Sequence, residues 1–111
     1  MTLEKRMELE RRVVRKLIRV AKEHGWTCVA VDDGEERVRC DGEAEAMDAV
    51  FAVDESVMRF KHADHKATHC AVIVLGNDGW DAIADWSVGD GWADVMEAMD
   101  AYTDKLCEEV S

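Results

Sequence analysis

Apolar residues recur at helical spacing near both ends of the chain. They do so from residue 3 to about residue 24, and again after residue 91. Apolar positions three and four residues apart form one stripe along a helix, which the helix buries against its neighbours. Thr2 is suited to cap the first helix and Gly25 to end it. The expected inward positions are Leu3, Met7, Val13, Val14, Leu17, Ile18 and Ala21 in the first helix and Trp92, Val95, Met96, Met99, Tyr102, Leu106 and Val110 in the second.

The middle of the chain has the alternation and the turn residues typical of strands. Residues 26–31 and 37–40, separated by an Asp-Asp-Gly turn, predict a hairpin. Asp41 is then placed to cap a short helix over residues 43–51. Three further strands are expected over residues 56–62, 69–75 and 80–88, joined by turns at residues 63–66 and 76–79.

These elements predict an α+β fold, with an antiparallel sheet of about five strands and long N- and C-terminal helices packed on it. Residues 70–75 are apolar at every position, which is typical of a central strand covered on both faces. Two arrangements would cover it. The long helices lie on opposite sides of the sheet, or a second subunit covers one of its faces.

Length and composition suit one domain, residues 1–111. The chain has 111 residues, no proline and 48% hydrophobic residues, enough for a core. Its four widely spaced cysteines favour reduced thiols in a cytoplasmic protein, although Cys28 and Cys40 fall on paired strands and a bridge between them stays open. The N-terminal residues enter a charged helix rather than the apolar segment of a signal peptide. The longest uncharged run, residues 67–77, is too short to cross a bilayer.

The net charge of -11 opposes direct binding to a phosphate backbone. The charge is uneven, because residues 1–24 hold eight Lys and Arg against four Glu. The basic residues Arg12, Arg15, Lys16 and Arg19 of the first helix form a face that suits nucleic acid, an acidic partner, or the acidic helix of a second copy. The alternative is an ordinary ionic helix surface.

Six acidic residues follow one side of the C-terminal helix, opposite its apolar stripe. This acidic row consists of Asp90, Asp94, Glu97, Asp100, Asp104 and Glu108, with Asp81 and Asp85 as neighbours on one side of the preceding strand. Carboxylates one turn apart repeat every ~5.4 Å, close to the separation of neighbouring phosphates. The row predicts either a partner-binding surface that imitates a nucleic-acid backbone or a solvated helix face.

A histidine cluster is the second candidate site. His62, His65, His69 and Cys70 occur close together in the sequence. Three imidazoles can hold zinc or nickel, but no CxxC or HExxH spacing accompanies them. The alternative is that they are polar residues at the exposed end of a hairpin.

The expected turn at residues 63–66 also assigns these side chains to faces. It would pair Phe60 with His69 and His62 with Ala67, so that His62 and His69 share one face and Cys70 lies on the other. Because adjacent residues of a strand point to opposite faces, His69 is poorly placed to activate the Cys70 thiol.

No catalytic centre or cofactor is predicted. With 25 acidic residues, pairs of carboxylates are expected by chance, and none is accompanied by a Gly-rich phosphate loop or a spaced histidine. Trp80, Trp86 and Trp92 are expected to fill the core. Trp80 follows a turn, however, and is an alternative candidate for an exposed interface anchor.

Three short segments resemble small uncharacterised acidic proteins of phages and prophages. They are Ala52-Val53-Asp54-Glu55 with Arg59-Phe60, then residues 72–81, then Ile83-Ala84-Asp85-Trp86-Ser87. The similarity covers roughly residues 50–90 and consists of turn and strand signatures, so it implies no activity. It implies a mobile element acting in bacterial cytoplasm, where small acidic proteins often block host enzymes or defence nucleoproteins.

The function expected is therefore that of a non-enzymatic acidic binding protein. It would inhibit a host nucleic-acid-binding complex, as an anti-CRISPR-like nucleic-acid mimic does, with its carboxylates in a basic groove of the partner. One alternative is a structural or regulatory homodimer. Another is a metal-binding domain that uses His62, His65 and His69. No membrane partner is expected.

Overall fold

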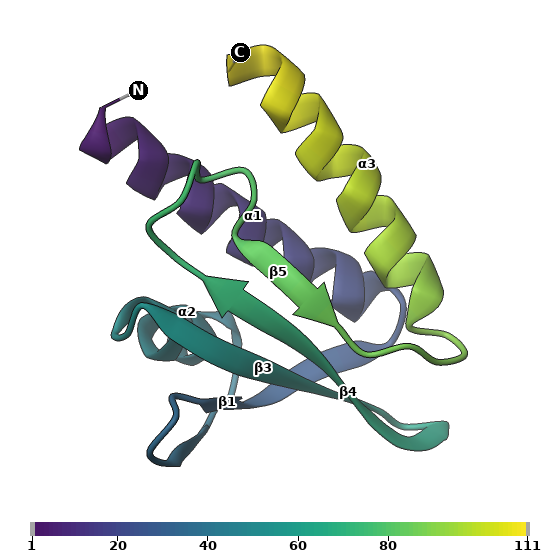
Figure 1. Ribbon diagram of the computed structural model, residues 1–111. Helices are drawn as coiled ribbons and strands as arrows, with labels where there is room; N and C mark the ends of the chain where they lie inside the picture. Colours follow the sequence, from purple (N-terminus) through teal and green to yellow (C-terminus); the bar gives the residue numbers. More distant parts are fainter. Residues whose placement is uncertain (1, 111) are drawn as a thin grey trace.

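The computed structural model describes residues 2–110 and confirms the α+β fold (Figure 1). Long helices stand at both ends of the chain, and the sheet is antiparallel throughout. The elements are α1 (Leu3–Glu23), β1 (Trp26–Asp32), β2 (Arg37–Arg39), α2 (Glu43–Phe51), β3 (Glu55–His62), β4 (His65–Val74), β5 (Ile83–Trp86) and α3 (Ala93–Val110). None of the helices in the described part of the chain is long and apolar enough to span a bilayer.

The five strands lie in the order β2-β1-β3-β4-β5, and the helices cover one face of this sheet. We call this side the helix face and the other side the open face. Along β3, Met58 and Phe60 are fully buried on the helix face, whereas Val57 and Arg59 are only partly buried on the open face. The helices also contact one another, α1 lying against both α2 and α3. The core therefore forms a single layer between sheet and helices.

This one-sided arrangement corrects the expectation for β4. Ala71 and Ile73 are fully buried, but Val72 and Val74 on the open face keep partial exposure. The long helices do not lie on opposite sides of the sheet. β-Branched residues favour extended backbone even on a half-exposed surface, so an apolar run of this kind does not require burial on both faces.

α1 forms as its capping residues predict, and five of its seven expected inward residues, those from Val13 to Ala21, are buried. Thr2 Oγ1 accepts a hydrogen bond of 3.1 Å from the Lys5 amide, and Gly25 follows the helix with φ of 87°. Leu3 and Met7 remain 61% and 42% exposed, because the first turns of α1 extend past the sheet (Figure 1). The core begins at Leu9, a position outside the expected stripe.

Three local expectations are also wrong. The Asp41 side chain does not cap α2, because Gly42 is the N-cap and makes no side-chain hydrogen bond. β5 begins at Ile83 rather than at residue 80, since residues 80 and 81 form a turn. β3 and β4 are joined by a shorter turn than expected, and a bulge in β4 pairs His62 with His65 instead of Ala67. The expected pairing of Phe60 with His69 is confirmed.

A buried carboxylate ties α1 to the turn between β4 and β5. Glu10 is 2% exposed, and its Oε2 accepts a hydrogen bond of 2.6 Å from the Gly76 amide. Arg6 Nε lies 3.8 Å from the same oxygen. Close to this contact, a Cβ on Gly79 would come within 2.9 Å of the Arg6 carbonyl oxygen and of Leu9. α1 therefore determines where the chain resumes after the turn, at Trp80.

Replacing Glu10 tests this tie. Glu10→Ala removes the acceptor of the Gly76 amide, and a lost hydrogen bond to a charged group costs about 1.5–3 kcal/mol. We expect a loss of about 2 kcal/mol in the free energy of unfolding, measured by urea denaturation. The control is Glu8→Ala, which removes an exposed carboxylate from a surface pair with Lys5 and should cost less than about 0.5 kcal/mol. Equal losses in the two variants would contradict the tie.

Candidate functional site

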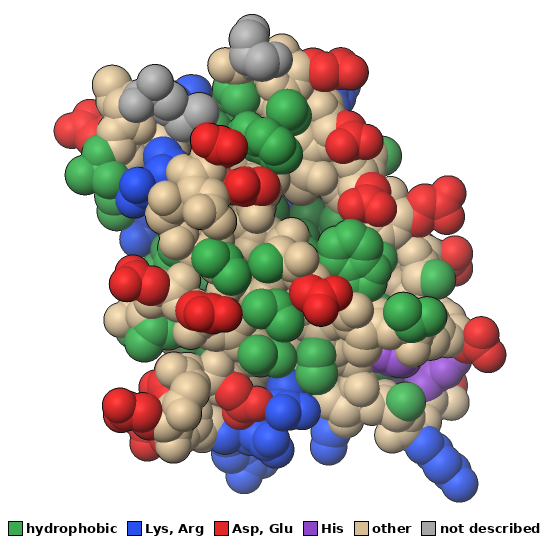
Figure 2. All heavy atoms as spheres, in the orientation of Figure 1, with side chains coloured by type: hydrophobic (Ala, Val, Ile, Leu, Met, Phe, Trp, Pro, Cys, Tyr) green, Lys and Arg blue, Asp and Glu red, His purple; other side chains and the backbone are tan. Residues whose placement is uncertain are grey.

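The acidic row is exposed along the outer side of α3. Its members are Asp90, just before the helix, and Asp94, Glu97, Asp100, Asp104 and Glu108 within it, and all six are exposed. The opposite side of α3 buries Val95, Met99 and Leu106, as its spacing predicts. Among residues 2–110, no ion pair joins the first five carboxylates of the row to a Lys or Arg side chain. Red carboxylates accordingly follow this helix in Figure 2.

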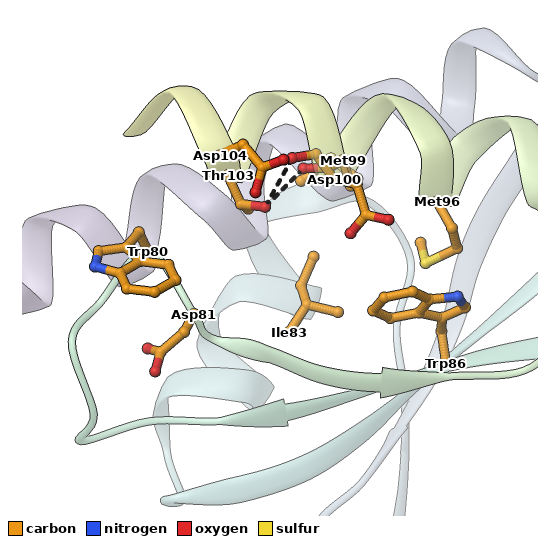
Figure 3. A pocket seen from close by; sticks show the side chains of 9 residues that line it. All are labelled: Trp80, Asp81, Ile83, Trp86, Met96, Met99, Asp100, Thr103 and Asp104. Atoms are coloured by element: carbon orange, nitrogen blue, oxygen red, sulfur yellow. Dashed lines mark hydrogen bonds between the residues drawn. The ribbon is translucent and has the colours of Figure 1, made fainter. Parts of the chain in front are cut away.

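A cleft of about 230 Å³ lies between α3 and the segment that leads into β5 (Figure 3). Apolar and aromatic side chains line it, and three carboxylates stand beside them. The lining residues are Trp80, Asp81, Ile83, Trp86, Met96, Met99, Asp100, Thr103 and Asp104. We call this site the tryptophan cleft. It brings Asp81, which precedes β5, together with two members of the acidic row, Asp100 and Asp104.

A bulge in β5 builds one wall of the tryptophan cleft. Val72 pairs with Asp85, but the next residue, Ile73, pairs with Ile83, so Ala84 is an extra residue in β5. Ile83 and Trp86 both come to the helix face as a result, and Asp85 is left on the open face. The expectation that Asp81 and Asp85 share one side with Ile83 is therefore wrong, because strict alternation fails at the bulge.

The turn before β5 holds the other wall. Asp81 Oδ1 accepts a hydrogen bond of 3.0 Å from the Asp78 amide. The same turn is fixed to α1 through Gly76 and Glu10. Trp80 is half-buried and lines the cleft, so it is neither a core residue nor a fully exposed anchor. The tie between α1 and the turn thus positions Trp80 and Asp81.

The composition of the tryptophan cleft suits a cationic side chain. An indole face attracts a cation within ~6 Å of its centre, and nearby carboxylates add a charge-assisted contact. Lys and Arg have apolar stems that can lie along a surface such as Ile83 and Met96 while the charged group reaches the rim. The sequence signals for this site are aromatic residues near Asp81 and the apolar positions of α3. Both signals are as typical of a hydrophobic core as of a binding cleft.

The histidine cluster has a packing role. His62, His65 and His69 surround Trp26, with ring centroids 5.1, 5.3 and 5.0 Å from it. A Cβ on Gly25, Gly91 or Gly89 would press on the rings of His62, His65 and His69 respectively. Within residues 2–110, no group of three or more His, Cys, Asp or Glu side chains is placed to hold a metal ion. The cluster therefore does not support the metal-binding alternative.

His69 is held more tightly than the other two rings. It is 6% exposed, and its Nδ1 lies 2.9 Å from the Ser87 hydroxyl. That hydroxyl also accepts a hydrogen bond from the Cys70 amide. The His69 ring stacks against Trp92 with a centroid separation of 5.7 Å. Burial, with a smaller contribution from His65, lowers the pKa of His69 below its usual value.

The structure shows the surroundings of the Cys28 and Cys70 thiols. Burial raises the pKa of the Cys28 thiol to about 12, so it stays protonated at neutral pH. No disulfide joins Cys28 to Cys40. Cys70 lies on the open face, where Arg59 Nη1 is 3.8 Å from its sulfur, while the His69 ring packs on the helix face. The expected separation of His69 from the Cys70 thiol is confirmed.

The basic face of α1 is used within the chain. Arg19 Nε donates to Glu43 at 2.8 Å, and Arg15 Nε lies 3.9 Å from the same carboxylate. Lys16 Nζ stands 5.4 Å from the centre of the Tyr102 ring. These contacts weaken the alternative in which this face pairs with the acidic helix of a second copy.

The lowered pKa of His69 predicts a pH dependence of stability. The unfolded chain binds more protons than the folded chain below about pH 6.5, so stability present above that pH is lost as the pH falls through the lower folded pKa. We expect His69→Gln to reduce the slope of the unfolding free energy between about pH 7 and 5, measured by urea denaturation. The exposed His24 provides the control, and His24→Gln should keep the wild-type slope. An unchanged slope in His69→Gln would refute the assignment.

No protein-family model, curated protein or solved structure matches this chain. Its function is therefore inferred from the acidic row and the tryptophan cleft.

Proposed function

We propose that the chain is a non-enzymatic binding protein that inhibits a nucleic-acid-binding partner by occupying its basic groove. The acidic row and the tryptophan cleft would form the contact surface. One observation carries this proposal. Among residues 2–110, Asp94, Glu97, Asp100 and Asp104 of α3 form no ion pair with a Lys or Arg side chain, and two of them meet Asp81 at the rim of an aromatic cleft.

The acidic row costs stability, which favours a role beyond solubility. Like charges three or four residues apart destabilise a helix by about 0.2–0.5 kcal/mol per pair, and the row contains four such pairs between Asp94 and Glu108. Asp104 and Glu108 also lie toward the C-terminal end, where the helix dipole disfavours negative charge. Lys105 is the one basic residue of α3. A partner rich in Lys and Arg would relieve this repulsion.

The tryptophan cleft would supply the short-range part of the contact. Interface energy concentrates in a few desolvated pockets, and Trp and Arg are enriched in them. An Arg or Lys side chain in the cleft would meet Trp80 or Trp86 along its stem and Asp81, Asp100 or Asp104 at its charged end. The acidic row would steer the partner, and the cleft would hold it.

The resemblance of residues 50–90 to phage and prophage proteins supports a bacterial host as the setting. Within it, a nucleoprotein such as a CRISPR effector has the Lys- and Arg-lined groove that this chemistry requires. A helix-paired homodimer receives less support, because Glu43 already pairs with Arg15 and Arg19.

A triple charge reversal tests the acidic row. Glu97→Lys, Asp100→Lys and Asp104→Lys together replace attraction by repulsion at exposed positions and leave the core untouched. We expect immobilised wild-type protein to retain nucleic-acid-binding proteins from bacterial lysate, with duplex DNA displacing them, and the triple variant to retain none of them. Mass spectrometry identifies the retained proteins.

The matched control reverses three exposed carboxylates elsewhere, Glu23, Glu45 and Asp48, with the same change in charge. It should retain the same proteins as the wild type. Retention by the triple variant, or proteins that duplex DNA does not displace, would exclude the proposal.

Replacing Trp80 tests the tryptophan cleft separately. Trp80→Ala removes one aromatic wall, and the loss of an interface hot spot of about 2 kcal/mol corresponds to a roughly 30-fold weaker affinity. We expect this change against the retained partner in calorimetry, with the salt dependence of binding preserved. Val88→Ala, at a side chain that is 91% exposed and outside the cleft, is the control. Equal affinities for Trp80→Ala and wild type would show that the cleft is not part of the interface.

A further inference from the structure

The open face of the sheet carries a charge opposite to that of α3. A shallow hollow of about 490 Å³ on this face is rimmed by four cationic side chains. Its lining residues are Val29, Ala30, Arg37, Arg39, Arg59, Lys61 and Thr68. Four of the 14 Lys and Arg residues in a chain of net charge -11 therefore gather at one place. In Figure 2, Lys and Arg side chains likewise cluster below the strands, away from the carboxylates of α3.

The strand register explains the shape of this hollow. Arg39 pairs with Ala30, which pairs with Arg59, so two arginines flank one small side chain across three strands. Adjacent strands lie ~4.8 Å apart, which places the Cα atoms of the two arginines ~10 Å from each other. Ala30 leaves the space between them unfilled. Lys61 continues the cationic rim one step along β3.

Of the four cationic side chains, Arg37 and Arg59 are held by an intramolecular carboxylate, whereas Arg39 and Lys61 can contact a ligand. Asp32 accepts hydrogen bonds from Arg37 and from Arg59. Burial would raise the pKa of Asp32, but these hydrogen bonds outweigh it and hold the pKa below its usual value. Arg39 and Lys61 are exposed, and no ion pair among the described residues includes either of them.

The other carboxylates of the open face lie away from Lys61. Glu55 pairs with Val74, one step beyond the half-buried side chains Val57 and Val72. These two valines pair with each other, and Asp32 and Asp85 flank them in the same row. The open face is therefore a cationic hollow beside an apolar strip.

We propose that this face binds a single strand of nucleic acid, with its phosphates in the cationic hollow and its bases along the valines. Guanidinium and ammonium groups are the usual partners of phosphate oxygens. A duplex keeps its base faces stacked inside and would leave the apolar strip uncovered. A strand exposes both phosphates and bases to one flat surface. The hollow is open and shallow, which suits a chain of phosphates better than one enclosed phosphate.

The net charge of the chain does not prevent this contact. The acidic row borders the tryptophan cleft beside β5, and β5 lies three strand spacings, ~14 Å, from β1 at the hollow. That separation exceeds the Debye length of ~8 Å at physiological ionic strength, beyond which solvent-exposed charges are largely screened. Local charge at the hollow therefore dominates, and the expectation drawn from net charge alone does not apply to this surface.

The test measures binding of a fluorescein-labelled oligothymidylate by fluorescence anisotropy across a range of salt concentrations. Each phosphate contact by a single strand contributes about -0.7 to the slope of log K against log salt concentration. We expect a slope between about -1.4 and -2.8 for the wild type, corresponding to two to four contacts. Arg39→Ala with Lys61→Ala should make the slope shallower by about 1.4 and weaken binding on the order of 25-fold at 0.1 M salt.

The control is Lys5→Ala with Lys22→Ala, which changes the net charge equally through exposed residues of α1 and should bind as the wild type does. A wild-type slope shallower than about -0.7, or equal binding by the Arg39/Lys61 variant and the control, would overturn the proposal. So would equal binding of a duplex of the same length, or full displacement by inorganic phosphate at matched ionic strength. Binding by the α3 triple variant at wild-type strength would show that this surface acts independently of the acidic row.

Discussion

The burial of one face of a five-stranded sheet under three helices determines where the other features of this chain lie. Trp26, Phe60 and Trp92 meet in that layer, with ring centroids 4.8 Å apart for Phe60 and Trp92 and 5.5 Å apart for Trp26 and Trp92. Because the helices cover only one face, the alternate positions of each strand lie on the open face. On β2 and β3 those positions include Arg39, Arg59 and Lys61. The outward side of α3 carries carboxylates, so the largest groups of opposite charge lie on different elements.

Within this layer, polar contacts at a few buried points have consequences at the surface. Glu10 holds the turn that carries Trp80 and Asp81, and His65 and His69 pack on the segment that leads into α3. Trp26 Nε1 donates to the Gly91 carbonyl at 3.2 Å, which attaches the start of α3 to β1. Both walls of the tryptophan cleft thus depend on hydrogen bonds outside it, and a substitution at Glu10 would displace a surface that it does not touch.

The parts of the fold that were predictable from the sequence are those with local causes. Thr2 and Gly25 mark the ends of α1 because capping and a positive φ depend on neighbouring residues alone. The bulges at Ala84 in β5 and between His65 and His69 in β4 were not predictable, since each depends on the pairing of whole strands rather than on neighbouring residues. Their effects are large. One moves Asp85 away from Asp81 and brings Trp86 to the cleft, and the other pairs His62 with His65.

Residue type also does not determine which part of an element is buried by its neighbours. Leu3 and Leu9 are equally apolar, yet Leu3 extends past the sheet and Leu9 lies against the turn at Gly79. The alternation of β3 likewise shows two sides without saying which side the helices take. Net charge is likewise an incomplete guide to binding, because it is a sum over the whole chain. A partner responds mainly to the charges within about one Debye length of its contact. Two exposed surfaces that are further apart than that length can therefore carry opposite charges. The two surfaces proposed here match the two components of a nucleoprotein, its basic groove and its nucleic acid.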